Sequence, residues 1–252
     1  MKAKSKTLRI MTTSATVIVL HSFMFNDTKM IADVLSEAEG RQSVVVRISR
    51  SKASRSIRNL FQPLAILELT TEFKHAGQMH TVKEAHIAHA YTSIPFHPYK
   101  LSISIFLAEF LSNITRGGQQ NDPLLFRYIT DSLQWLDETQ SNFANFHIVF
   151  LIRITRFIGI YPNTDNYASG CCFDLINGCF TSGQYTGKTY LSSQETAVMH
   201  KLMRMNYNTM HLFRMSRNER NRCLDAIIQF YRLHIPEFRE MKSLAVLRDI
   251  MS

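Results

Sequence analysis

The stretch that decides the fold of the N-terminal part runs from Thr16 to Ile48 and reads TVIVLHSFMFNDTKMIADVLSEAEGRQSVVVRI. It contains three short runs rich in β-branched and aromatic residues, separated by the turn-like pairs Asn26-Asp27 and Glu39-Gly40. Such runs, bounded by Asn, Asp and Gly, are typical of strands joined by tight turns. Two further runs follow, LAILELTTEF at 64–73 and TVKEAHIAHA at 81–90. Five short strands in succession predict a small antiparallel barrel.

The second part of the chain has a different apolar period. Beyond Pro95 and Pro98 the apolar residues recur at the spacing of amphipathic helices. Asp122 followed by Pro123 is a typical helix start. The expected helices cover about 101–115, 122–138, 143–158, 193–204, 216–234 and 241–251. Residues 163–190 are rich in Gly, Asn, Ser and Thr, which predicts a loop or small hairpin.

These patterns predict an α+β chain. We expect a basic leader over residues 1–12, a five-stranded barrel domain over 13–92 and a mainly α-helical domain over 93–252, with the loop or hairpin insertion at about 163–190. The leader is expected to be a short disordered arm unless Met11 is the natural start. The chain of 252 residues is 45% hydrophobic and 19% charged, a globular composition rather than a disordered or fibrous one.

Basic residues are concentrated between the third and fourth predicted strands. No Asp or Glu occurs between Glu39 and Glu68. That interval holds these basic residues: Arg41, Arg47, Arg50, Lys52, Arg55 and Arg58. Together with a formal net charge of +9, this concentration predicts contact with a nucleic acid, an anionic membrane or an acidic protein. The alternative is a solvated loop without a partner.

The sequence lacks the common catalytic and cofactor motifs. TGKT at 186–189 resembles the end of a phosphate-binding loop, but that loop requires Gly where Ser182 stands. Four histidines lie on or near the fifth strand: His80, His86, His89 and His97. No cysteine or carboxylate stands near them at ligand spacing, so we interpret them as surface side chains. The carboxylates are scattered singly, and we therefore expect neither an enzyme nor a bound cofactor.

The cysteines do not have the spacing of a zinc site. Cys171 and Cys172 are adjacent, and Cys179 follows after six residues. Adjacent side chains of an extended segment point to opposite faces, which makes them poor joint ligands. We therefore expect buried thiols without metal. The absence of a disulfide framework, a signal peptide or a membrane-spanning segment predicts a cytoplasmic protein.

Several stretches, in order along the chain, resemble one family. They are VIVLHSFMFNDTKMIADVLSEAEGR at 17–41, RISRSKASRSIR at 47–58, LFQPLAILEL at 60–69, FLAEFL at 106–111, FANFHIVFLIRITRFIGIYPN at 143–163 and YRLHIPEFREMKSLAVLRDI at 231–250. In this order they resemble the RecO family of bacterial DNA repair and recombination mediators, closest to its Bacteroidetes-like subgroup. The resemblance extends from about Thr16 to the end of the chain.

The resemblance implies an N-terminal OB-fold barrel and a helical C-terminal domain. It also implies binding of single- and double-stranded DNA, annealing of complementary strands and, with RecR, help in loading RecA onto strands coated by single-strand DNA-binding protein, without ATP. The expected location is the cytoplasm, in association with the nucleoid. Many members carry a four-cysteine zinc module where SGCCFDLINGCF stands at 169–180, and this chain departs from that pattern. An RNA-binding or scaffolding protein without annealing activity remains the alternative.

Three groups of residues are candidates for these contacts. An OB barrel binds nucleic acid through a positive groove and aromatic platforms, so the six basic residues between Glu39 and Glu68 are the predicted phosphate contacts. Phe23 and Phe25 lie on one strand face, and we interpret them as core residues rather than as platforms for bases. Arg214, Arg217 and Arg220 recur every three residues and predict one helix face, either a second phosphate-contacting patch or a salt-bridged surface.

The resemblance also implies a pocket for the acidic C-terminal tail of single-strand DNA-binding protein. Arg127, Arg153 and Arg156 interrupt apolar helical stripes and are the predicted basic rim of that pocket. The alternative for each is a local ion pair, for example with Asp131.

Overall fold

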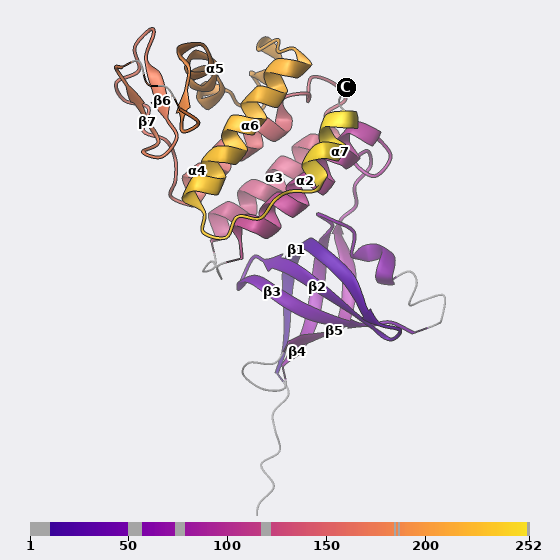
Figure 1. Ribbon diagram of the computed structural model, residues 1–252. Helices are drawn as coiled ribbons and strands as arrows, with labels where there is room; N and C mark the ends of the chain where they lie inside the picture. The colour runs from indigo at the N-terminus through magenta and orange to yellow at the C-terminus, as the bar shows by residue number, and fades with distance from the viewer. Residues whose placement is uncertain are drawn as a thin grey trace, which may run out of the picture. The chain divides into compact units, whose positions relative to one another are not determined.

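The structure is a computed structural model that describes residues 11–49, 57–73, 79–116, 122–183, 185 and 187–250 (Figure 1). By their contacts the residues form two compact units. The first comprises the chain up to Tyr91 together with Leu107–Thr130, and the second comprises Thr92–Phe106 and the chain from Asp131 onward. Helices α2 (Pro98–Ile114) and α3 (Pro123–Glu138) therefore contribute residues to both units.

The strands of the first unit close into a barrel, as Figure 1 shows. They are β1 (Met11–Asn26), β2 (Lys29–Ser36), β3 (Gly40–Arg47), β4 (Ile66–Phe73) and β5 (His80–His89), in the ring order β1-β2-β3-β5-β4. The predicted five-stranded OB-fold barrel is thus confirmed. The expectation of purely antiparallel pairing was wrong at one seam, where β3 and β5 pair in parallel. A closed ring with an odd number of strands cannot be antiparallel throughout.

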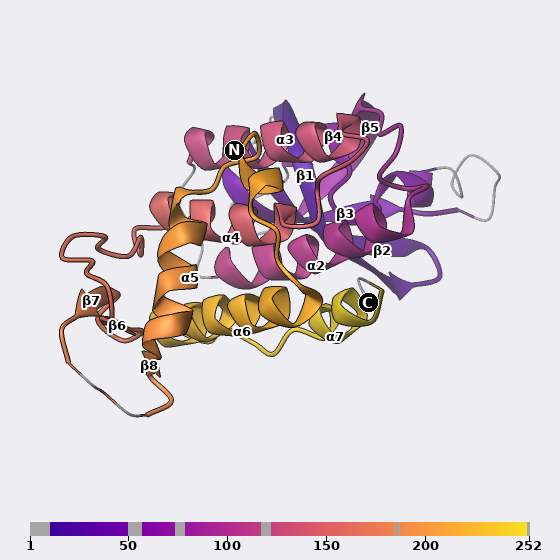
Figure 2. The same ribbon diagram turned by 90° about the horizontal axis from the view of Figure 1, so that it is seen from above.

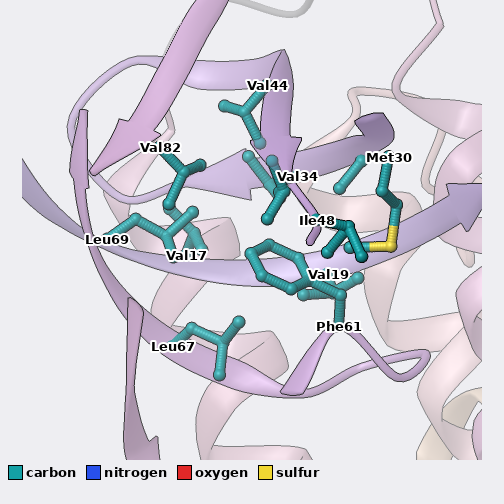
Figure 3. Close-up of a cluster of buried hydrophobic side chains, with 12 residues drawn as sticks. Val17, Val19, Met30, Val34, Val44, Ile48, Phe61, Leu67, Leu69 and Val82 are labelled. Atoms are coloured by element: carbon teal, nitrogen blue, oxygen red, sulfur yellow. The ribbon is translucent and has the colours of Figure 1, made fainter. Parts of the chain in front are cut away.

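The interior of the barrel is filled by side chains that alternate along each strand. β2 places Met30, Ala32 and Val34 inside, where they pack with apolar side chains of β1, β3 and β4 (Figure 3). Phe61, which follows a helical turn at 57–60, is also buried in this cluster. Part of the outward face is buried as well, for example at Ile18 and Leu35, whereas the end of β1 next to the β2 hairpin is exposed.

The second part of the chain is mainly helical, as predicted. Its further elements are α4 (Phe146–Phe157), α5 (Ser193–Arg204), the 3₁₀ helix η1 (Met210–Leu212), α6 (Arg217–His234), α7 (Ser243–Ile250), and strands β6 (Cys172–Asp174), β7 (Cys179–Thr181) and β8 (Tyr190–Leu191). The short strands form a small sheet next to α5 (Figure 2) within the predicted hairpin region. Ser192 and Ser216 cap α5 and α6, each in a reciprocal capping box with a Glu. None of the described helices has the length and apolar character needed to cross a membrane.

A buried polar cluster anchors the start of the second unit. The carboxylate of Asp137 accepts hydrogen bonds from the backbone N–H groups of Thr92, Ser93 and Ile94, each at 2.8 Å. Burial acts to raise the pKa of Asp137, but these donors outweigh it and lower the pKa to about 2. The buried Lys100 Nζ donates to the Asp137 carbonyl at 3.1 Å, which satisfies an acceptor at the end of α3.

Candidate nucleic-acid interface

The hairpin of β1 and β2 carries aromatic and basic side chains on the outside of the barrel. In its register Phe23 lies opposite Ile31, and Asn26 lies opposite Lys29. Residues that lie directly opposite each other share one face of a sheet. The neighbouring Met30 is 2% exposed and points into the core, so Ile31 and Phe23 point outward.

A bulge in β1 explains the outward direction of Phe23. Val19 belongs to the core cluster, and the register shifts between Val19 and His21. A shift of one residue exchanges the two faces of a strand. Beyond the bulge it is Ser22 that points inward, where its Oγ donates a hydrogen bond of 2.9 Å to the Phe61 carbonyl.

Phe23 and Phe25 are accordingly exposed, by 45% and 63%. Their interpretation as core residues was wrong, because the first register shift turns Phe23 outward and Phe25 lies at a second shift, between Met24 and Asn26. The ring of His21 lies 5.7 Å from that of Phe23, at an interplanar angle of 37°. Exposed aromatic rings on an OB barrel are the kind of surface on which bases stack.

Exposed cations lie beside these rings. Lys29 pairs in register with Arg47, so the two side chains come from adjacent strands on one rung of the sheet. Arg58 follows in the helical turn at 57–60 and is also exposed. None of the three forms an ion pair within the part of the chain that the structure describes. Sequence reasoning missed Lys29, because only the strand register brings it next to Arg47.

The other basic residues of the predicted group have different positions. Arg50, Lys52 and Arg55 lie outside the described residues. Arg41 forms an ion pair of 2.9 Å with Asp33 and donates hydrogen bonds to the Ser112 carbonyl and to Thr115 Oγ1. All of these contacts lie within the first unit. The Arg41 side chain is only 15% exposed. The phosphate-binding role predicted for Arg41 therefore competes with an existing structural role.

A cavity opens in the barrel wall where β3 and β5 separate. Its volume is about 200 Å³, and its lining includes Val46, Ile57 and Val82 with the cations Arg47 and Lys83. In the described residues these strands pair at Val44–His80 and Val45–Thr81, and the cavity lies next to these pairs. Lys83 Nζ forms an ion pair of 2.7 Å with Glu72. Arg47 thus stands between the cavity and the exposed hairpin.

The three arginines near the start of α6 do not form one helix face. The helix begins at Arg217, so Arg214 precedes it, contrary to the prediction. The guanidinium of Arg217 donates to the Arg248 carbonyl at 3.0 Å, and that of Arg220 donates to the Met215 carbonyl at 2.6 Å. Arg214 and Arg220 nevertheless line one cavity of about 410 Å³. The remaining lining residues are Asn142, Ala144, Asn145, Met210, His211, Phe213, Met215 and Ser216.

The predicted rim residues lie on two helices. Arg127 is exposed on α3, in the part that belongs to the first unit. Arg153 and Arg156 lie on α4 in the second unit; Arg153 donates to the Met205 carbonyl at 3.1 Å, and Arg156 lies over the ring of Tyr161. Arg153 and Arg156 are neighbours on one helix surface of the second unit, and Arg127 belongs to the first unit.

The cysteines lie in and next to the small sheet. Cys171 and Cys172 are buried, and Cys172 faces Thr181 while Cys179 faces Asp174 in the β6–β7 register. Across the described ranges, no three His, Cys, Asp or Glu side chains are grouped as a metal site would need. Aromatic packing holds this hairpin, with Tyr167 and His200 stacked at 3.7 Å and Phe180 against both. The cysteines therefore do not fit the zinc module of the resembling family.

Comparisons with known proteins agree in both parts of the chain. Residues 11–91 match the family model described as "Recombination protein O N terminal", and residues 96–245 match "Recombination protein O C terminal". Proteins named "DNA repair protein RecO" from Phocaeicola vulgatus and Bacteroides fragilis are each 45% identical to this chain; the alignments cover 93% and 92% of it, and 97% and 96% of the relatives. The protein of that name from Porphyromonas gingivalis is 32% identical, over 92% of this chain and 96% of the relative.

Proposed function

Because this chain belongs to the RecO family of DNA repair proteins, we propose that it is a recombination mediator that binds DNA and anneals complementary strands. It binds single- and double-stranded DNA, and with RecR it helps to load RecA onto strands coated by single-strand DNA-binding protein. It acts without catalysis or a nucleotide cofactor, in the cytoplasm at the nucleoid.

The observation that supports this proposal most is the set of exposed, unpaired cations on the barrel. Lys29, Arg47 and Arg58 have no ion pair in the described ranges, and the sequence adds Arg50, Lys52 and Arg55 between Arg47 and Arg58. Lysine and arginine side chains of this kind bind phosphates without reading the sequence. A protein that holds strands by their phosphates leaves the pairing edges of the bases free, as annealing requires.

The experiment that tests this proposal measures annealing of complementary oligonucleotides without nucleotide. A protein variant with Lys29, Arg47 and Arg58 replaced by Ala is expected to anneal more slowly than the wild type. Competition between single-stranded DNA and RNA of one sequence separates this function from the alternative of an RNA-binding or scaffolding protein. Tighter binding of RNA, together with no annealing, would contradict the proposal.

The partner contact of the helical unit is a second part of the proposal. We propose that the acidic tail of single-strand DNA-binding protein binds to the second unit, where Arg153 and Arg156 are the members of the predicted rim. The cavity of about 410 Å³ near the start of α6 combines apolar side chains with Arg214 and Arg220, and it is a second location for the same peptide. A pocket with basic groups around it fits an acidic peptide.

Two matched variants separate the two locations. One replaces Arg153 and Arg156 by Ala, and the other replaces Arg214 and Arg220 by Ala. Binding of a labelled tail peptide is measured by fluorescence anisotropy. The variant that has lost the arginines of the peptide site is expected to bind the peptide more weakly, and the other variant is expected to bind it as the wild type does. Unchanged binding after the replacement of Arg127, Arg153 and Arg156 together would remove the predicted rim.

A further inference from the structure

The exposed pair Phe23 and Phe25, here named the aromatic pair, has no role in the core. We propose that the aromatic pair is a stacking platform for unpaired bases, and that it makes the barrel favour single-stranded over duplex DNA. The inference rests on the proposed function, since it assigns a strand preference to the same face of the barrel. It concerns a contact with bases, whereas the cations contact phosphates.

The bulge in β1 gives the first argument. Without it, Phe23 would continue the inward alternation of Val17 and Val19 and would be buried. The register shift instead turns the ring outward, at 45% exposure, and Phe25, which lies at the second register shift between Met24 and Asn26, is 63% exposed. β-Bulges redirect side chains, often next to binding sites, and they interrupt the regular backbone hydrogen bonding between the two strands. A bulge that turns Phe23 from the core face to solvent, beside the exposed Phe25, favours a function in binding over one in stability.

The surroundings of the aromatic pair give the second argument. Ile31 faces Phe23, and Val45 faces Ile31 on the next strand; both are half-buried. A ring and two β-branched side chains on adjacent strands therefore form a continuous apolar strip across the barrel. Such a strip suits the flat face of a base, which requires no hydrogen-bond partner.

The charges beside this strip identify the ligand as a polyanion. Lys29 lies one strand away from the end of β1, and Arg47 lies two strands away on the same rung. At about 5 Å between strands, both cations start within about 10 Å of the β1 backbone. The turn between β1 and β2 carries the negatively charged Asp27, which repels phosphates. The phosphates are therefore expected to lie next to Lys29 and Arg47 and away from the turn. Aromatic rings beside exposed cations match a single strand, which presents bases and phosphates in alternation.

Only an unpaired strand exposes both the faces of its bases and its phosphates to the barrel. In a duplex each base face is covered by its neighbours in the stack, and the phosphates alone remain accessible to the barrel. Stacking on an aromatic ring also holds a base by its face and leaves its pairing edge open. The aromatic pair is therefore compatible with annealing, because a held base can still meet its complement.

The test compares three variants, and a conservative Phe23→Tyr/Phe25→Tyr variant, on three DNA ligands. The first variant replaces Phe23 and Phe25 by Ala, the second replaces Lys29 and Arg47 by Ala, and the third is the control Ile87→Ala, which removes a 55% exposed apolar side chain from β5. The ligands are a single strand of mixed sequence, the corresponding duplex, and an abasic strand with the same phosphates. Binding is measured by anisotropy over a range of salt concentrations.

The Phe23→Ala/Phe25→Ala variant is expected to bind the single strand about 10- to 100-fold more weakly, with an unchanged salt slope. Its affinity for the duplex and for the abasic strand is expected to stay within about twofold of the wild type. Phe23→Tyr/Phe25→Tyr is expected to restore binding, because tyrosine keeps the aromatic face. The Ile87→Ala control is expected to bind every ligand as the wild type does.

Other outcomes contradict the inference. Equal losses on all three ligands would show that the rings support the fold or the phosphate contacts. Unchanged binding of the single strand would assign the aromatic pair to a different partner. Wild-type protein that does not bind the single strand would overturn the proposed function itself. Loss of binding in the Lys29→Ala/Arg47→Ala variant, together with wild-type binding in the Phe23→Ala/Phe25→Ala variant, would overturn only the stacking assignment.

Discussion

Replacing Lys29, Arg47 and Arg58 by Ala is expected to change the salt dependence of DNA binding. Each side chain is exposed and without an ion pair in the described ranges, so each is available for one phosphate. Three phosphate contacts on a single strand correspond to a log–log salt slope of about −2, from about −0.7 per contact. The slope of the variant is therefore expected to be flatter than that of the wild type by about two units.

The same calculation gives the change in affinity. A fourfold rise in salt, from about 50 to about 200 mM, weakens three such contacts by about 20-fold in total. The ratio of wild-type to variant affinity is therefore expected to fall by about 20-fold over this range. A parallel variant with Arg50, Lys52 and Arg55 replaced by Ala is expected to flatten the slope by a similar amount if those residues also contact phosphates.

Arg41→Ala is the matched control, because it removes the same charge from a different environment. Arg41 is paired with Asp33 and hydrogen-bonded to the Ser112 carbonyl, so its loss is expected to lower the free energy of unfolding by about 1–3 kcal/mol. Its effect on the salt slope is expected to be small. Isothermal binding titrations at four salt concentrations and urea unfolding measure both quantities. The reasoning fails if Arg41→Ala flattens the slope and the triple variant does not.

Two further predictions concern the helical unit. The purified protein is expected to contain no stoichiometric zinc, and one zinc per chain by elemental analysis, lost on replacing Cys172 and Cys179, would contradict this. Burial, followed by the charge of Arg220, lowers the pKa of His147 from 6.5 to about 3. The neutral ring therefore stabilises the fold above about pH 6.5, and this contribution is lost as the pH falls toward 3. Between pH 6.5 and pH 4 the free energy of unfolding of a His147→Phe variant is expected to fall less than that of the wild type. If the free energy of unfolding depends on pH in the same way in both proteins, His147 does not cause the loss of stability at low pH.

The strands and helices could be predicted from local patterns, because each element carries its own period. The alternation in β2 placed Met30, Ala32 and Val34 in the core, and Asp122-Pro123 marked the start of α3, where the Asp122 side chain accepts hydrogen bonds from two backbone N–H groups. Parallel pairing of β3 with β5 could not be predicted locally, since it depends on how the whole ring closes.

The candidate site was less predictable, because it depends on contacts between distant residues. Phe23 was assigned to the core since the sequence gives no sign of the bulge before it. Arg41 and Arg47 belong to one basic stretch, yet the structure pairs Arg41 with Asp33 and leaves Arg47 exposed. Lys29 stands alone in the sequence and meets Arg47 only through the strand register.

The decisive measurement is the rate of annealing of two complementary strands, without nucleotide and with only this protein added. We expect that the wild type accelerates annealing and that ATP does not change the rate. The Lys29→Ala/Arg47→Ala/Arg58→Ala variant is expected to be slower, whereas folded Arg41→Ala protein is expected to keep the wild-type rate. A wild-type protein that binds single-stranded DNA but leaves the spontaneous annealing rate unchanged would contradict the proposed function.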